Sequence, residues 1–365
     1  MKRRLSRLGT VVAALAVAAG AAEVVPAGAV APTVVTCGQV ITQNTTLAGD
    51  VGPCPSPGQW GIDIGANNIT LDLNGYRVFG VSVPGDGAGI RVFRRSGVTI
   101  KNGAVAAFDG GVVIEGGSGH TVRNITAEDN IGLTPRSRVG DGIALLSTTG
   151  NLIERNVARR NGPFAGIGVY SLIDADHPRS TSGISSGNNI RYNEVYENVR
   201  QRNLGSPTNT GTDNDGIRLE PGTVNNSVTD NTVYGNGLDG IALFVGSGYN
   251  NISRNTVYGN GFFRTTARRG TGIQVFARAN GNFIAYNTVT GNADNGINIS
   301  NLSSGNRIVA NRSVENRALT PISGSNWDLA DRNAGGTCNH NQWIGNTYGT
   351  ADPVCTTTGG TLAVP

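Results

Sequence analysis

Hydrophobic and polar positions alternate along most of the chain in short runs, which are separated by turns rich in glycine, asparagine and serine. Alternation with a period of two predicts strands that bury one face. The runs recur in a fixed order: Gly-Ile-x-Φ, where Φ is an apolar residue, then Asn-x-Ile-x-x-Asn, then a third run that ends on Asn. Clear copies begin at Gly142, Gly166, Gly216, Gly240, Gly272 and Gly296, and looser copies begin at Gly61, Gly89 and Gly111.

The length of the repeat indicates a solenoid. The shortest copy has 24 residues and contains three strand-like runs. In a solenoid of this kind each strand pairs with the equivalent strand of the next turn, about 4.8 Å away. We therefore predict an all-β chain that forms a single parallel β-helix of nine to ten turns. An α-helical fold is not expected, because β-branched residues dominate the runs and no segment keeps a 3.6-residue period.

Asparagine recurs at two fixed places in the repeat. Asparagine tolerates a positive φ at a sharp turn, and identical amides one turn apart can bond to each other as a ladder. We interpret both rows as structural and not as catalytic polarity. The first row is Asn156, Asn193, Asn231, Asn255, Asn287 and Asn311, and the second is Asn161, Asn198, Asn236, Asn260, Asn292 and Asn316.

The two ends of the chain indicate export. Residues 1–29 combine four basic residues, an apolar run and small residues before Ala29, which is the pattern of a cleaved signal peptide. No later segment is apolar enough for a membrane anchor, so we expect a secreted, extracellular protein. The cysteines form two local pairs, Cys37 with Cys54 and Cys338 with Cys355. We expect disulfides that fasten an N-terminal cap over residues 30–60 and a C-terminal cap over residues 327–365, with β-helix turns over residues 61–326.

The charge balance excludes nucleic acid as a partner. The formal net charge is +4, of which the predicted signal peptide accounts for +3. The mature chain is therefore close to neutral and has no basic surface of the kind that binds phosphate backbones. We expect a monomer whose partner is a polysaccharide or another glycan.

At this level of detail the chain resembles a known family. The segment TCGQVITQNTTLAGDVGPC, the following NNITLDLNGYRVFG and the repeats resemble the right-handed parallel β-helix proteins of the pectate-lyase-like superfamily, and more narrowly secreted bacterial proteins with NosD-type or PbH1-type repeats. The resemblance covers nearly all of the mature chain and implies a right-handed β-helix. In lyases of the superfamily, calcium or arginine neutralises a uronate and a basic residue removes a proton, so the resemblance implies such a role for Arg218. Fold alone does not fix function.

Four inserts interrupt the otherwise minimal turns. Residues 131–140, 199–214 and 262–270 precede a Gly-Ile-x-Φ strand, and residues 172–186 follow one. All four border one face of the predicted rod, and long loops are where functional residues concentrate.

The strand on this face should also present side chains outward. We expect a shallow trough with exposed aromatic rings, on which sugar rings can stack, although such rings can also merely shield strand backbone. His177, in the fourth insert, is placed to reach it. The candidate substrate-binding residues are Tyr170, Glu220, Phe244, Gln274, Phe276 and His177.

Carboxylates precede the glycine of three repeats. Asp215 and Asp239 fall in adjacent turns, roughly 5 Å apart, and Asp141 lies two turns from Asp215, roughly 10 Å away. A separation of about 5 Å suits a retaining glycosidase, and about 6.5–9.5 Å an inverting one. Two other interpretations stay open: aspartates that cap turn N–H groups, and a calcium site formed by Asp213, Asp215 and Asp239.

These observations lead to a functional hypothesis with two rivals. The hypothesis is an extracellular enzyme, a glycoside hydrolase or polysaccharide lyase, that uses Asp215 and Asp239 as acid/base or nucleophile, with Arg218 stabilising charge and Asp141 nearby. It needs no cofactor, and calcium is the one alternative. The first rival is a noncatalytic solenoid that binds glycan or protein. The second is an epimerase or another isomerising or cyclising chemistry on the same scaffold.

Overall fold

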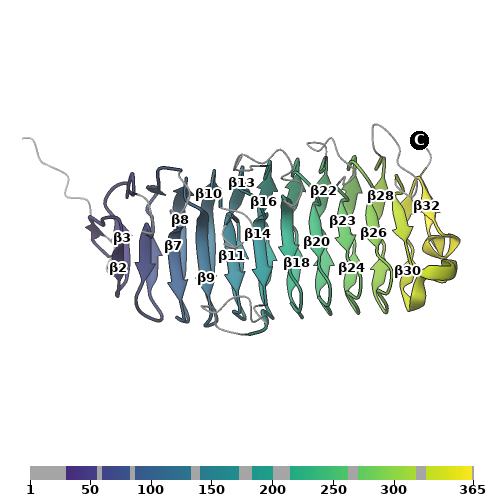
Figure 1. Ribbon diagram of the computed structural model, residues 1–365, viewed down its shortest axis with the longest axis horizontal. Helices are drawn as coiled ribbons and strands as arrows, with labels where there is room; N and C mark the ends of the chain where they lie inside the picture. The colour runs from purple at the N-terminus through teal and green to yellow at the C-terminus, as the bar shows by residue number, and fades with distance from the viewer. Residues whose placement is uncertain are drawn as a thin grey trace, which may run out of the picture.

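The computed structural model of the chain describes residues 30–55, 60–82, 87–132, 140–171, 183–199, 214–261, 270–317 and 326–363. These residues form a rod in which the strands run across the long axis and the chain advances steadily from one end to the other (Figure 1). The predicted signal peptide, His177 and Asp213 lie outside the described residues.

One side of the rod is a sheet of 12 strands, all paired in parallel. Each Gly-Ile-x-Φ motif supplies one strand, and the register aligns equivalent residues, as where Ile217 pairs with Ile241 and Ile241 with Ile273. Its strands are β2 (Gln39–Ile41), β4 (Ile62–Ile64), β7 (Ala88–Phe93), β9 (Gly110–Glu115), β11 (Ile143–Leu146), β14 (Ala165–Tyr170), β17 (Asp215–Leu219), β20 (Ile241–Leu243), β23 (Ile273–Val275), β26 (Ile297–Ile299), β29 (Leu329–Asp331) and β32 (Ala351–Asp352).

The remaining strands form a second sheet of 21 strands, two for most turns, which meet at a corner. They are β1 (Pro32–Thr33), β3 (Thr45–Leu47), β5 (Thr70–Asp72), β6 (Arg77–Phe79), β8 (Thr99–Ala106), β10 (Thr121–Glu128), β12 (Leu152–Glu154), β13 (Val157–Arg159), β15 (Asn189–Arg191), β16 (Glu194–Tyr196), β18 (Ser227–Thr229), β19 (Thr232–Tyr234), β21 (Asn251–Ser253), β22 (Thr256–Tyr258), β24 (Phe283–Ala285), β25 (Thr288–Thr290), β27 (Arg307–Val309), β28 (Arg312–Val314), β30 (Gln342–Ile344), β31 (Thr347–Tyr348) and β33 (Thr361–Leu362).

This architecture confirms the predicted parallel β-helix. Nine strands of the 12-stranded sheet, from β4 to β26, lie in the predicted turns over residues 61–326, in agreement with the nine to ten turns expected. Strand β2 lies in the predicted N-terminal cap, and β29 and β32 lie in the predicted C-terminal cap. The core is a stack of aliphatic side chains that repeat from turn to turn, such as Ile217, Ile241 and Ile273, all fully buried. Each such side chain contributes about 1.5–3 kcal/mol by leaving water. The glycine before the isoleucine is required by close packing, because a Cβ on Gly216 would lie 2.3 Å from a methyl group of Val233.

Both predicted asparagine rows form ladders. Asn255 donates from Nδ2 to Asn287 Oδ1 at 3.0 Å and to the Val228 carbonyl at 2.8 Å, and its own Oδ1 accepts from Asn231 Nδ2 at 3.0 Å. The side chains therefore satisfy corner backbone groups that strand pairing leaves without partners. A third ladder, with Nδ2–Oδ1 distances of 2.6–3.1 Å, comprises Asn151, Asn188, Asn226, Asn250, Asn282, Asn306 and Asn341.

The prediction that the asparagines of the first row adopt a positive φ was wrong, because the positive φ occurs one residue earlier. The left-handed conformation belongs to the residue before each ladder asparagine, as at Arg254 (φ 56°) and Tyr286 (φ 58°). The asparagine itself stays outside this region because its side chain must point into the rod to reach the next amide.

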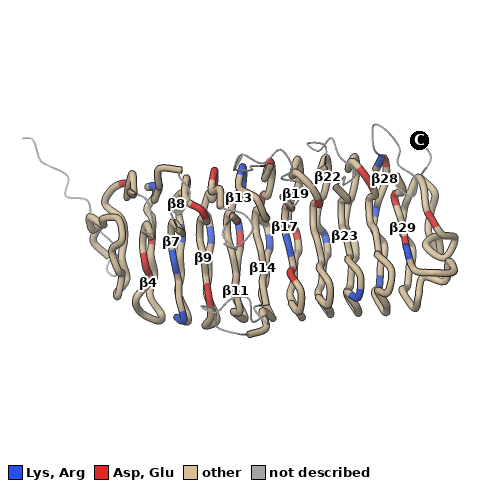
Figure 2. The backbone as a smooth tube through the Cα atoms, in the orientation of Figure 1, with Lys and Arg blue, Asp and Glu red and all other residues tan. Residues whose placement is uncertain are grey.

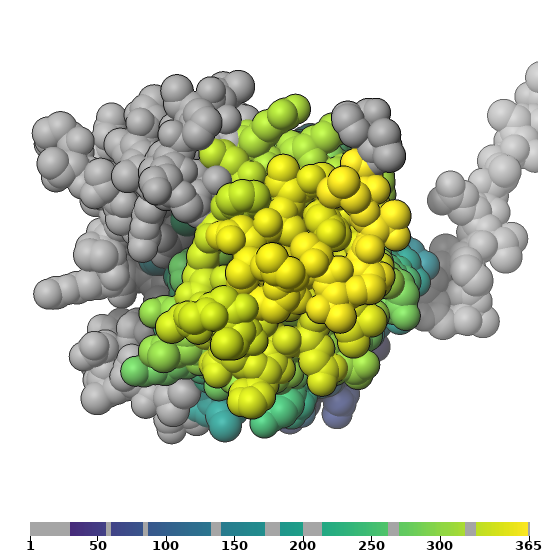
Figure 3. All heavy atoms as spheres, turned by 90° about the vertical axis from the view of Figure 1, so that its right-hand side faces the viewer, coloured from purple at the N-terminus to yellow at the C-terminus, as the bar shows by residue number. Residues whose placement is uncertain are grey.

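Each end of the rod carries a disulfide, Cys37–Cys54 and Cys338–Cys355. At the C-terminal end three short 3₁₀ helices, η1 (Ala334–Gly336), η2 (Cys338–His340) and η3 (Val354–Thr357), lie beside the last strands. The C-terminal residues cover the end of the rod in Figure 3.

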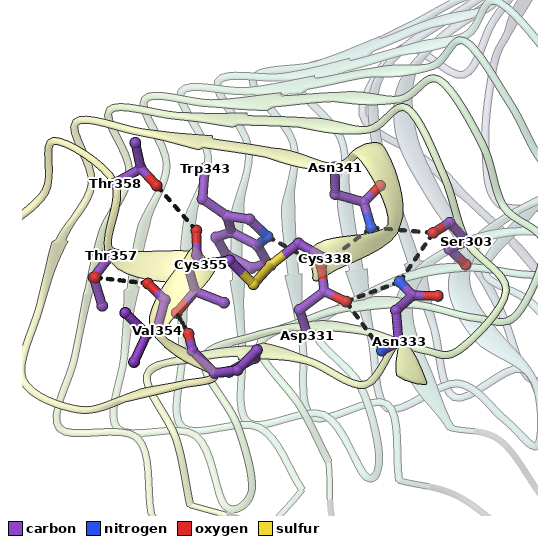
Figure 4. Close-up of a disulfide and its surroundings, with 12 residues drawn as sticks. Ser303, Asp331, Asn333, Cys338, Asn341, Trp343, Val354, Cys355, Thr357 and Thr358 are labelled. Carbon is purple, nitrogen blue, oxygen red and sulfur yellow. Dashed lines mark hydrogen bonds between the residues drawn. A yellow bond between two sulfur atoms is a disulfide. The ribbon is translucent and has the colours of Figure 1, made fainter. Parts of the chain in front are cut away.

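The third ladder ends on a carboxylate beneath this cap (Figure 4). Asp331 accepts hydrogen bonds from Asn341 Nδ2 and from Trp343 Nε1, both at 3.1 Å. A carboxylate only accepts, so it can end a row of amides whose last N–H group needs an acceptor. Among the described residues, no helix has the length and apolar character needed to cross a bilayer.

Candidate functional site

The three candidate aspartates lie on the 12-stranded sheet and each binds backbone of the following turn. Asp141 Oδ1 accepts from the Ala165 N–H at 2.8 Å, Asp215 Oδ1 from the Asp239 N–H at 3.1 Å, and Asp239 Oδ1 from the Thr271 N–H at 2.7 Å. All three are buried, with exposed fractions of 1%, 0% and 4%. The capping interpretation is therefore confirmed for one oxygen of each carboxylate, except that the capped N–H belongs to the next turn and not to the same one.

Arg218 connects the buried carboxylates to the outer part of the site. Its Nη1 lies 3.3 Å from Asp215 Oδ2, and its Nε donates to Glu220 Oε1. The guanidinium carbon lies 3.8 Å above the centre of the Phe244 ring, a cation–π arrangement, and Phe244 stacks on Phe276 at 4.5 Å. Figure 2 shows this neighbourhood as a basic segment on β17 followed by an acidic one.

Tyr170 is buried on the outer face of the sheet, which corrects the expectation of an exposed ring. Its exposed fraction is 2%, and its hydroxyl donates to Asp141, 2.9 Å from Oδ1 and 2.8 Å from Oδ2. The ring lies across Gly168, where a Cβ would come within 2.4 Å of it. Tyr170 also packs against Ala144 and Leu146 as a small apolar cluster on the outer face of the sheet.

The predicted open trough is wrong for the same stretch of the sheet. Arg218, Ala242 and Gln274 are buried, as are the small residues Ala144 and Gly168. The half-buried part of the face consists of Glu220, Phe244 and Phe276. Exposure depends on side-chain rotamers and on neighbouring turns, which strand alternation does not specify.

Burial shifts the protonation of the inner pair. Desolvation raises the pKa of Asp141 to about 7, although the Tyr170 hydroxyl and the charge of Arg218 act in the opposite direction. Desolvation, reinforced by the nearby Asp141 charge, also raises the pKa of the Tyr170 hydroxyl. Asp141 therefore keeps its proton to a higher pH than an ordinary aspartate, and a protonated carboxyl group can act as an acid.

Gln274, a candidate for substrate binding, is fully engaged within the protein. Its Nε2 donates to the Val275 carbonyl at 3.1 Å and to Ser300 Oγ at 3.0 Å, and its Oε1 accepts from Asn298 Nδ2 at 2.9 Å. Sequence reasoning did not select Asn298 or Ser300, although both occupy outward positions beside Gln274 and Phe276 in the next copy of the repeat.

No metal site emerges from the part of the chain that the structure describes. Within those ranges no group of three or more His, Cys, Asp or Glu residues could hold an ion. The calcium alternative included Asp213, which lies outside them, so it stays a prediction, as do the roles expected for Asp213 and His177.

The fold and the repeat identify the family. The model of the right-handed β-helix region matches residues 61–257 and 208–358, so the chain belongs to this family. No curated protein matches the sequence significantly.

Solved structures agree with this assignment. A variant of the periplasmic alginate epimerase AlgG is similar with a TM-score of 0.54 and 14% identity, over 90% of this chain and 78% of the epimerase. The Dettilon tailspike protein gp208 is similar with a TM-score of 0.50 and 15% identity, over 86% of this chain. This chain spans 55% of the tailspike's length. At such identities the similarity shows the fold alone.

Proposed function

We propose that this protein is exported and acts on a polysaccharide, which it binds and cleaves on the outer face of the 12-stranded sheet. The observation that carries the proposal is the linked group of ionisable side chains on neighbouring turns: Asp141 with Tyr170, and Asp215 with Arg218 and Glu220. Desolvation makes such groups costly, and clusters of buried ionisable residues with perturbed pKa values are enriched at functional sites.

The scaffold does not require charge at these positions. Asn295 occupies the position equivalent to Asp239 two turns later, and its neutral Oδ1 accepts from the Trp327 N–H at 3.0 Å. An amide therefore caps the next turn as well as a carboxylate does. Ala144 and Ala242 likewise fill outward positions equivalent to Arg218 and are fully buried. This comparison supports a role for the acids and the arginine beyond folding.

In the proposed mechanism two carboxyl groups act as a pair, one donating the proton and the other acting ionised as nucleophile or base. Two pairs are available, Asp215 with Asp239 or Asp141 with Asp215, and the raised pKa of Asp141 suits it to be the acid of the second pair. The register places Asp215 and Asp239 in adjacent turns, about 4.8 Å apart along the rod, a spacing that suits a retaining reaction. Asp141 and Asp215 are two turns apart, about 10 Å, just beyond the range of about 6.5–9.5 Å for an inverting reaction. Arg218 stabilises negative charge that develops on the substrate.

The half-buried residues would meet the substrate first. Phe244 and Phe276 offer aromatic surface for sugar rings, and Glu220 can accept hydrogen bonds from hydroxyl groups. Arg218 contacts both Phe244 and Glu220 and reaches Asp215 behind them, so it would couple substrate binding to the inner carboxylates.

Two further observations support the proposal. The alginate epimerase is named for a polysaccharide, so the same fold is used for chemistry on such polymers. The predicted signal peptide and two disulfides fit an oxidising compartment outside the cytoplasm.

The test is a panel of neutral and uronate polysaccharides with and without chelator, scored for new reducing ends and for unsaturated products that absorb in the ultraviolet. Asp215→Asn and Asp239→Asn should each lower the cleavage rate by about 10²-fold or more. Asp63→Asn is the matched control, because Asp63 pairs with Arg91 at 2.6 Å on the same sheet and lies five turns from Arg218. Undiminished cleavage by both site variants would contradict the assignment of the carboxylates.

A noncatalytic glycan-binding role is the second candidate, and the full burial of Asp215 favours it. This alternative predicts saturable binding to one polysaccharide with no new reducing ends, no unsaturated product and no dependence on Asp141.

A further inference from the structure

Toward the C-terminal end of the same face, Asn298 on β26 carries an unusual polar atom. The residue is 9% exposed, and its side-chain oxygen is buried and accepts no hydrogen bond. A buried carbonyl without a donor lowers the stability of the fold and calls for an explanation. A donor that arrives with a ligand would satisfy it, provided that the Asn298 side chain turns outward on binding.

The hydrogen-bond network fixes which atom of the amide lacks a partner. Gln274 Nε2 donates to the Val275 carbonyl, so Gln274 must present its oxygen to Asn298. Asn298 in turn must present Nδ2 to Gln274, at 2.9 Å, which leaves its oxygen as the unpaired atom. Exchanging the two ends of both amides would set the Gln274 oxygen against the Val275 carbonyl, a repulsive contact.

An aromatic surface lies in the next outward row. The register pairs Gln274 with Asn298, so Phe276 and Ser300, two residues further along each strand, are neighbours on the same face. Phe276 is half-buried and is stacked on Phe244 with an interplanar angle of 25°. Ser300 Oγ is held by Gln274 at 3.0 Å.

We propose that Phe276, Ser300 and Asn298 form a subsite for a neutral sugar unit, which stacks on the Phe276 ring and donates a hydroxyl hydrogen to Asn298 Oδ1. The subsite lies two to three turns beyond Arg218, about 10–15 Å along the rod. Its polar groups are the Asn298 carboxamide and the Ser300 hydroxyl, which match sugar hydroxyl groups and offer no charge to a carboxylate. This inference rests on the proposed function, and it assigns the substrate a run of neutral units on the C-terminal side of Arg218.

The test measures binding of the full chain to soluble β-glucan, mannan, xylan, alginate and polygalacturonate by affinity electrophoresis. The wild type should bind at least one neutral polymer, and Asn298→Leu and Phe276→Ala should each weaken that binding by about tenfold. Asn251→Leu is the control, because Asn251 also has a buried, unpaired side-chain oxygen but lies on the other sheet, and it should bind like the wild type. Thermal melting shows whether each variant is folded. If Asn298→Leu does not fold, the binding of Phe276→Ala decides the question.

The outcomes separate the two proposals. Wild-type affinity in both site variants, or binding and cleavage of uronate polymers only, would overturn the subsite and leave the proposed function standing. A wild type that neither binds nor cleaves any polymer of the panel would overturn the proposed function and the subsite together.

Discussion

At the scale of single residues, burial sets the protonation of the site by shifting side-chain pKa values. Asp141 keeps a pKa of about 7 because it is desolvated, even though Tyr170 and Arg218 both favour its ionised form. Sequence position alone suggested Asp141, Asp215, Asp239 and Arg218, because the repeat brings these charged residues to one face of the rod beside the inserts. It could not indicate that Tyr170 would fold over Gly168, because that depends on one rotamer and on the space that a glycine leaves.

Asp141→Asn should change the pH dependence of stability. Below pH 3.8 Asp141 is protonated in both the folded and the unfolded chain. Between pH 3.8 and about 7 it is ionised in the unfolded chain but still protonated in the folded chain. Wild-type stability therefore falls with rising pH by an amount on the order of 4 kcal/mol from this group. Asn cannot ionise, so the variant should gain stability relative to the wild type between pH 5 and pH 8 in urea denaturation.

Asp230→Asn provides a control of opposite sign. The hydrogen bond from Arg254 lowers the pKa of Asp230, so its ionised form stabilises the fold at neutral pH and loses this effect as the pH falls. This variant should lose stability relative to the wild type as the pH rises. Parallel curves for Asp141→Asn and the wild type would contradict the environment assigned to Asp141.

At the scale of elements, the corners of the β-helix are held by amides as much as by strand pairing. Each ladder residue serves the turn before it and the turn after it, as Asn255 does for Asn231 and Asn287. Two ladders were predictable because the asparagines recur at a fixed spacing. The third belongs to the first Asn of the Asn-x-Ile-x-x-Asn run, which stands five residues before each member of the first row. Its spacing is equally regular, so the same argument would have predicted this ladder too.

Asn255→Leu should destabilise the protein by about 3 kcal/mol or more, because the change leaves the Asn231 side-chain and backbone N–H groups and the Val228 carbonyl buried without partners. Chemical denaturation measures the loss. Thr256→Ala, on the exposed side of the same turn, should cost less than about 0.5 kcal/mol. Equal effects of the two substitutions would show that the ladder does not stabilise the corner.

At the scale of the whole molecule, the rod is a stack in which each turn contacts mainly its neighbours, so stability adds up from turn to turn and the ends are its weak points. The repeat predicted this architecture because a 24-residue unit cannot bury its own apolar face. The burial of Arg218 and Tyr170 on the outer face was not predictable, because it depends on side-chain rotamers and on the residues of neighbouring turns, which the period of the repeat does not specify.

Replacing Cys338 and Cys355 by serine should loosen one end only. The disulfide closes a loop with a sequence separation of 17, and its loss should cost about 3 kcal/mol. Hydrogen exchange should then quicken in residues 326–363 and stay slow in residues 214–261. The equivalent change at Cys37 and Cys54 should affect the opposite end. Uniform loss of protection along the chain would contradict a stack of nearest-neighbour turns.

The central claim is that the outer face of the 12-stranded sheet carries the polysaccharide. The most direct test is a crystal structure of the Asp239→Asn variant soaked with an oligosaccharide of whichever polymer the wild type cleaves or binds. The account predicts sugar density on the outer face between Glu220 and Ser300, with a ring against Phe276 and a hydroxyl within hydrogen-bond distance of Asn298 Oδ1. Density confined to the 21-stranded sheet would contradict it.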